Sequence, residues 1–190
     1  HITARLSQQR IVSNPMWFRV RAYLDGSARR LKYGEYEIPP GMTLRELLAL
    51  FVAGKVRQYP VTLVEGWTFR QVLNALGQTP PLKTLTTGKS PREIMQMIGA
   101  ADEQPEGRFY PDTYFVTKGT SDIDVLKRAY RKMQAVLAQE WANRAEGLFY
   151  ATSYESLIVA SIIEKETARA DERPHIAGVF IRRLAKGMLL

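Results

Sequence analysis

The chain has 190 residues, of which 45% are hydrophobic and 24% charged, a composition that is ordinary for a globular protein of one or two domains. It has no cysteine and two histidines, His1 and His175, which excludes disulfides, cysteine nucleophiles and thiolate metal sites and leaves no credible two-histidine metal site. The net charge is +8, and residues 1–60 hold 10 Lys/Arg against 4 Asp/Glu, so the N-terminal third could meet an anionic polymer or acidic lipid headgroups.

Cap residues and hydrophobic patterns predict the elements of this basic third. Asn14 followed by a proline is typical of a helix start, and Thr43 and Gly54 are typical of a helix start and end. The alternation around Gly34 is typical of a strand, with the glycine as a possible bulge. We therefore expect helices over 2–12, 16–24 and 43–54 and a strand over 31–38.

From residue 61 onward, the same signals predict more helix than strand. Ser121 or Asp122 caps a long helix, and Thr152 with Glu155 has the spacing of a capping box before a stretch without Gly or Pro that reaches residue 170. Residues 77–91 and 104–114 read as loops. The expected elements are a strand over 61–64 and helices over 68–76, 91–98, 122–142, 153–170 and 171–186. Because strands and helices do not alternate regularly, we predict an α+β fold.

The helix predicted after Thr152 carries an apolar run, residues 157–163, that leads directly into Glu164 and Glu166. Helical spacing places Glu166 above the bulkier apolar stripe, formed by Ile163, Ile162 and Val159, and favours it over Glu164 as the more desolvated of the two acids. A carboxylate that is partly removed from water can hold a proton near neutrality and act as a general acid. The alternative is that both glutamates simply end a core helix and face water.

Several blocks of the chain are similar to one known family. Residues 160–167, Ala-Ser-Ile-Ile-Glu-Lys-Glu-Thr, resemble the signature helix of the endolytic murein transglycosylases. Residues 106–114, Glu-Gly-Arg-Phe-Tyr-Pro-Asp-Thr-Tyr, resemble the loop motif of that family, and residues 34–43 followed by a helix to Gly54 resemble its small LysM-like subdomain. Val64-Glu65-Gly66 also fits, so the resemblance covers essentially the whole chain.

The resemblance implies an enzyme, a lyase that cuts peptidoglycan glycan strands internally at the MurNAc-GlcNAc bond and leaves a 1,6-anhydro-MurNAc end. It places the catalytic acid, which later acts as the base, on Glu166, and implies no metal and no cofactor. The substrate-binding candidates are Glu106, Asp112, Tyr114 and Glu164. Tyr114 could instead pack in the core, and Glu164 could instead form a structural ion pair.

The resemblance also implies an organisation. We expect a LysM-like subdomain over residues 1–60 without its first strand, then a mixed α/β catalytic domain over 61–190 without its C-terminal part. The resemblance also implies an anchor in the bacterial inner membrane, one N-terminal helix that we expect to be missing from these residues, and a catalytic region in the periplasm. Expected partners are peptidoglycan strands and, among proteins, peptidoglycan synthases of the penicillin-binding class.

Two other functions compete with this interpretation, a cell-wall-binding scaffold and a pyridoxal-phosphate lyase, and two further ones have little support. The basic N-terminal third could make the protein a non-catalytic cell-wall-binding scaffold that recruits synthases, and its LysM-like part could either bind glycan or act as a spacer. A pyridoxal-phosphate lyase would need a phosphate cradle, for which the sequence has no signal. A Ser-His-Asp triad would have to use His175, and the scattered basic residues do not indicate a nucleic-acid partner.

Overall fold

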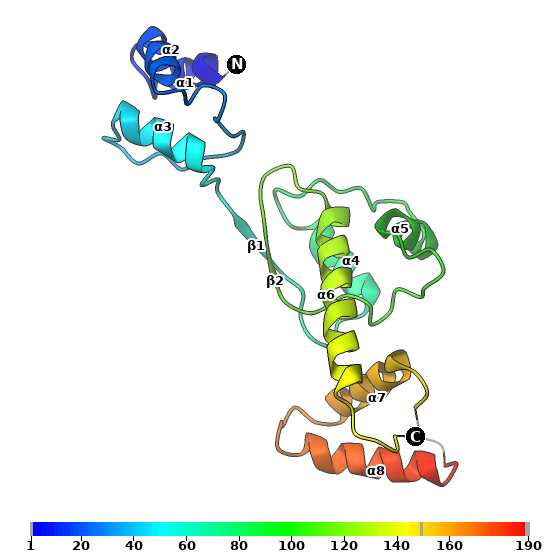
Figure 1. The fold of residues 1–190 in the computed structure, drawn as a ribbon. Helices are drawn as coiled ribbons and strands as arrows, with labels where there is room; N and C mark the ends of the chain where they lie inside the picture. Colours follow the sequence, from blue (N-terminus) through cyan, green and yellow to red (C-terminus); the bar gives the residue numbers. More distant parts are fainter. Residues whose placement is uncertain (1, 149, 189–190) are drawn as a thin grey trace. The chain divides into compact units, whose positions relative to one another are not determined.

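The computed structural model describes residues 2–148 and 150–188, which form eight helices and two strands (Figure 1). The chain divides into two compact units, His1–Tyr59 and Pro60–Leu190. Helices joined to one small sheet make this an α+β fold, as predicted. The identities that the sequence suggests for the two parts, a LysM-like subdomain and a catalytic domain, stay predictions.

Three helices pack together in the first unit: α1 (Ile2–Gln8), α2 (Pro15–Leu24) and α3 (Leu44–Ala53). The side chain of Asn14 accepts from the backbone N–H of Met16 and caps α2. Thr43 and Glu46 form a capping box at the start of α3, so both predicted helix starts are confirmed. The core is built from Leu6, Phe18, Ala22, Leu47, Leu48 and Phe51.

The strand predicted over residues 31–38 is wrong, because this segment is irregular in the structure. Its backbone is bonded at single points: Lys32 donates to the carbonyl of Phe51 at 3.1 Å, and the carbonyl of Glu35 accepts from Arg57 at 2.7 Å. A strand needs a ladder of repeated bonds to one partner, and alternating side chains cannot supply it. At Gly34 a Cβ would lie 2.1 Å from Cγ1 of Val56, so only glycine fits.

The second unit contains the sheet, in which β1 (Tyr59–Thr62) pairs with β2 (Thr113–Val116). The pairing continues beyond the strands, since the N–H of Leu63 donates to the carbonyl of Asp112 at 3.0 Å. The sequence prediction placed the first strand two residues too late and assigned the start of β2 to a loop. Four residues that follow a Pro-Asp pair are too short a run for alternation to be recognised.

Capping chemistry explains where the helices of this unit begin. Each of α4 (Phe69–Gly77), α5 (Pro91–Ile98), α6 (Asp122–Ala142) and α7 (Ser153–Glu166) starts after a Ser or Thr whose side chain and third following residue form a capping box. The predicted starts of α5, α6 and α7 are therefore confirmed, and that of α4 was placed one residue too early, at its cap Thr68. The buried core of this unit includes residues of α4, α5 and α6: Leu76, Ile94, Met95, Val125 and Leu126.

The C-terminal helices differ from the prediction at their ends. α7 ends at Glu166 and not near residue 170, because Thr167 is extended, with φ −148° and ψ 136°. The last helix, α8 (Arg173–Ala185), begins two residues later than predicted. Among the described residues, no helix has both the length and the apolar content that crossing a bilayer requires.

Asp122 joins α6 to the loop before α5, and we expect this link to be a main support of the second unit. Its carboxylate is fully buried and accepts from the backbone N–H groups of Leu85 and Thr86 and from the Thr86 hydroxyl, the last at 2.6 Å. Hydrogen bonds to a buried charge are worth more than neutral ones.

We predict that Asp122→Ala lowers the free energy of unfolding by about 3 kcal/mol, because it leaves buried donors without an acceptor. Urea denaturation followed by circular dichroism measures this loss. The exposed Asp102 provides the control, since Asp102→Ala makes the same chemical change at the surface. Equal midpoints for the two variants would contradict the structural role of Asp122.

Candidate active site

Polar contacts bring α7 against two loops that are distant in sequence. The hydroxyl of Tyr154 donates to the carbonyl of Glu106 at 3.2 Å, and Nζ of Lys165 donates to the carbonyl of Gly66 at 3.3 Å. The structure thus joins the helix that carries the block 160–167 to the loops that contain residues 64–66 and 106–114, which the sequence also singled out. Lys165, the residue between the two glutamates, makes one of the contacts that fix their helix.

The loop that contains Glu106 contacts the start of α4 and the start of α7. Both carboxylate oxygens of Glu106 lie within 3.2 Å of the backbone N–H of Phe69, the first residue of α4, where a negative charge also suits the helix dipole. Phe109 stacks on Phe69 with ring centroids 5.3 Å apart. The Arg108 guanidinium lies 3.9 Å from the ring centroid of Tyr154. In this structure the Glu106 carboxylate therefore serves as a helix cap.

Glu166 is the last residue of α7, and its side chain is exposed. The side chains of the apolar stripe become more exposed towards the end of the helix. Val159 is buried, Ile162 and Ile163 are partly exposed, and Glu166 faces water. The expectation that Glu166 is the more desolvated of the two acids is wrong in this structure. Glu164 is the less exposed acid.

Glu164 forms the ion pair that the sequence left open as its alternative role. Its carboxylate lies 2.9 Å from Nη2 of Arg173, the first residue of α8. Both side chains keep more than a third of their surface exposed, so the pair contributes at most about 1 kcal/mol. The ion pair ties the last turn of α7 to the first turn of α8.

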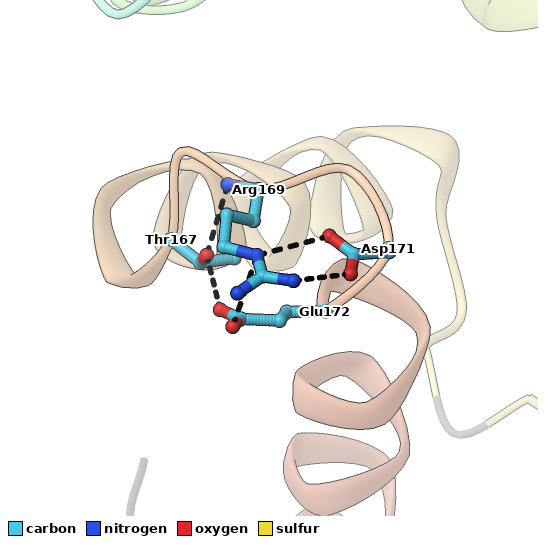
Figure 2. A network of polar contacts seen from close by, with 4 residues as sticks. All are labelled: Thr167, Arg169, Asp171 and Glu172. Carbon is cyan, nitrogen blue, oxygen red and sulfur yellow. Dashed lines mark hydrogen bonds and ion pairs between the residues drawn. The ribbon is translucent and has the colours of Figure 1, made fainter.

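A network of four residues reverses the chain immediately after Glu166 (Figure 2). The buried Thr167 hydroxyl donates to the carboxylate of Glu172 at 2.7 Å and accepts from the N–H of Arg169 at 3.0 Å. The Arg169 guanidinium pairs with Asp171 at 2.6 Å and with Glu172 at 3.3 Å. We call these residues, Thr167, Arg169, Asp171 and Glu172, the turn network. It fixes the point at which α7 ends and thereby the position of Glu166.

Asp112 and Tyr114 lie at the start of β2 and are bonded within the protein. The Lys132 ammonium and the Thr113 N–H both donate to the Asp112 carboxylate and hold the pKa of that carboxyl below its usual range. Tyr114 is buried, and its hydroxyl donates to the carbonyl of Tyr110 at 2.7 Å. Burial, with a smaller effect from the Asp112 charge, raises the pKa of Tyr114 to about 12.

Sequence reasoning did not single out Tyr154, Lys165, Thr167 or Arg173, although each positions α7. Thr167 and Lys165 lie inside the block that resembles the family signature, and that membership is the only signal that could have marked them. Arg173 gave no signal, because an ion pair between neighbouring helices depends on the angle of the turn. Among the described residues, no group of three His, Asp or Glu side chains has the geometry of a metal site.

Comparisons with known proteins agree on one family. The YceG-like family matches residues 1–190. Two proteins named endolytic murein transglycosylase, from Streptococcus pneumoniae strains D39 and R6, are each 27% identical to this chain over 84% of its length and 34% of theirs. A crystal structure of a YceG-like protein from Listeria monocytogenes has a TM-score of 0.52 and 25% identity, and the match covers 98% of this chain and 67% of that one. The chain spans about a third of the length of the curated relatives it matches.

Replacing Tyr114 by Phe tests whether its hydroxyl supports the fold. The substitution keeps the ring and leaves the Tyr110 carbonyl without its donor. We expect the free energy of unfolding to fall by about 1 kcal/mol, the usual net value of one such bond. Tyr33→Phe at an exposed tyrosine is the control. Unchanged stability of Tyr114→Phe in urea would show that the bond contributes nothing.

The pairing of Asp112 with Lys132 predicts a specific response to acid. Because the folded-state pKa of Asp112 is lowered from 3.8, its ionised form stabilises the fold above that value, and the stabilisation is lost as the pH falls through the lowered one. We expect the carboxyl carbon of Asp112 to titrate below pH 3.8 in NMR spectra and Lys132→Gln to move that titration upward. A titration that is identical in both proteins would refute the assignment of the cause to Lys132.

Proposed function

Because the chain belongs to the YceG-like family, we propose that it is the part of an endolytic peptidoglycan transglycosylase that carries the catalytic acid, Glu166. The substrate would be the MurNAc-GlcNAc bond within a glycan strand, and the product a 1,6-anhydro-MurNAc end. The family match over the whole chain carries this proposal. The names of the Streptococcus pneumoniae relatives support it at the level of reaction type.

The proposed reaction needs one acid, because the attacking group belongs to the substrate. Protonated Glu166 donates its proton to the glycosidic oxygen while the C1–O bond breaks and positive charge develops on the sugar ring. The C6 hydroxyl of the same muramyl residue then attacks C1, and the Glu166 carboxylate takes the hydroxyl proton. The acid is restored, and no water is consumed. The attack gains from proximity because both groups belong to one sugar.

The exposure of Glu166 adds a requirement to this mechanism. An acid that faces water lacks the apolar surroundings that favour the protonated form. We propose that the bound glycan strand supplies them by displacing water from the end of α7. The turn network supports this role, since it holds Glu166 at a defined place on the surface.

The four candidate substrate-binding residues would act in two different ways, by direct contact with sugar or by shaping the loop. Asp112 and Glu164 are partly exposed, so their carboxylate oxygens would accept further hydrogen bonds from sugar hydroxyls beside the internal bonds that they already make. Glu106 and Tyr114 would act by shaping the loop, because the carboxylate of Glu106 caps α4 and the hydroxyl of Tyr114 is bonded internally. We propose no metal and no cofactor for the reaction.

We also propose the setting that the family implies. The protein would act on the periplasmic side of the bacterial inner membrane, anchored by a single helix that precedes this chain. Its substrates would be peptidoglycan glycan strands, and its protein partners peptidoglycan synthases. The first unit would be a LysM-like subdomain, either binding glycan or serving as a spacer.

The test is digestion of purified peptidoglycan by the full-length protein, with products analysed by mass spectrometry. We expect ends with the anhydro mass, and we expect Glu166→Gln to reduce their rate of formation by roughly 10²–10⁴-fold, the usual contribution of general acid–base catalysis. Glu140→Gln, at an exposed position near the end of α6, is the matched control. Full activity of Glu166→Gln, or products with a hydrolytic mass, would reject the proposal.

A non-catalytic scaffold remains the second candidate, and the +6 charge of residues 1–60 favours it. A scaffold predicts that Glu166→Gln complements a deletion strain fully. It also predicts that charge reversal at the exposed Arg29, Arg30 and Lys32 abolishes complementation. The enzyme predicts that complementation fails with Glu166→Gln.

A further inference from the structure

Helix α2 turns an apolar face away from the core of its unit. Phe18 and Ala22 are buried on one side, whereas the opposite side carries five large side chains that are 40–81% exposed. At 100° per residue these five span about 120° of the helix circumference, centred opposite Phe18. We call them the α2 apolar arc: Met16, Trp17, Val20, Tyr23 and Leu24.

Arginines stand at both edges of this arc. Helical geometry places Arg19 and Arg21 about 40° beyond its two borders. Arg19 is exposed and lines a groove between α1 and α2 together with Met16. Arg21 pairs with Asp25 at 3.0 Å just after the helix, which itself contains no acidic residue. The surrounding unit holds 10 Lys/Arg against 4 Asp/Glu.

We propose that the α2 apolar arc is a docking surface for a membrane that contains anionic lipids. An interfacial helix has this design: an apolar face that enters the boundary between headgroups and acyl chains, and basic residues at its edges that remain among the phosphates. Trp17 and Tyr23 are the residue types enriched at that boundary. The net charge of +6 on residues 1–60 complements an anionic surface. In this arrangement α2 lies parallel to the membrane plane.

The chemistry of the arc favours lipid over a saccharide or a second copy of the chain. Sugars are held by aromatic faces combined with several hydrogen-bonding groups, whereas the arc carries two polar side-chain groups, the Tyr23 hydroxyl and the Trp17 indole N–H. A second copy would place two arcs, with the arginines at their edges and two units of charge +6, against each other.

Flotation of the 190-residue chain with lipid vesicles tests the proposal directly. We expect binding to vesicles of phosphatidylcholine and phosphatidylglycerol at a ratio of three to one, weak binding to pure phosphatidylcholine, and release of most of the protein at 0.5 M NaCl. The double variant Trp17→Gln/Leu24→Gln should bind at least about fivefold more weakly, because it removes apolar area from the arc. Its far-UV circular dichroism should match the parent, since both side chains are exposed.

Phe115→Gln is the matched control, because Phe115 is 54% exposed but belongs to β2 in the other unit. It should bind vesicles as the parent does.

Equal binding of the double variant and the parent, or no binding to anionic vesicles, would overturn the proposal. Dimers on size exclusion that the double variant abolishes, without vesicle binding, would assign the arc to a second copy. Binding to purified peptidoglycan that depends on Trp17, again without vesicle binding, would assign it to glycan. The readout is independent of Glu166, so it can fail while the proposed catalysis holds.

Discussion

Polar contacts at both ends of α7 join it to neighbouring segments, and the candidate site depends on them. Only Val159 of this helix is buried. Near its start Tyr154 reaches the 106–108 loop, and near its end Lys165 reaches Gly66 while Glu164 reaches α8. Each contact is weak by itself, since its groups are partly in water. Together they fix the helix at several points along its length, and the turn network then sets the residue at which it ends.

Local chemistry made helix starts predictable from the sequence. The hydroxyls of Thr43, Ser90, Ser121 and Thr152 all cap the helices that the sequence placed after them, because a capping box involves residues only three apart. Strands were predicted less well. Residues 31–38 have the right alternation but no ladder, and β2 has a partner about 50 residues away. Pairing at such distances leaves little trace in the strand's own sequence.

The candidate site shows the same division between local and tertiary information. Residue order identified Glu166, Glu164 and the loop around Glu106, and the structure brings that loop and the helix together. Helical periodicity did not predict how buried each glutamate is, because that reasoning assumes that an apolar stripe is buried over its whole length. Burial decreases from Val159 to Glu166 as the helix leaves the core. The roles of Tyr114 and Glu106 as internal bonding partners also depend on contacts that no spacing rule contains.

The close approach of Val56 to Gly34 has a consequence for how this protein can vary. Exchanging glycine for alanine in an irregular segment commonly raises stability by restricting the unfolded chain. That route is closed here, since any β-carbon would overlap the valine unless the backbone moved. An engineer who stabilises the first unit should therefore leave this position alone. In distantly related proteins, a glycine followed 22 positions later by a β-branched residue would indicate that the packing of Gly34 against Val56 is kept.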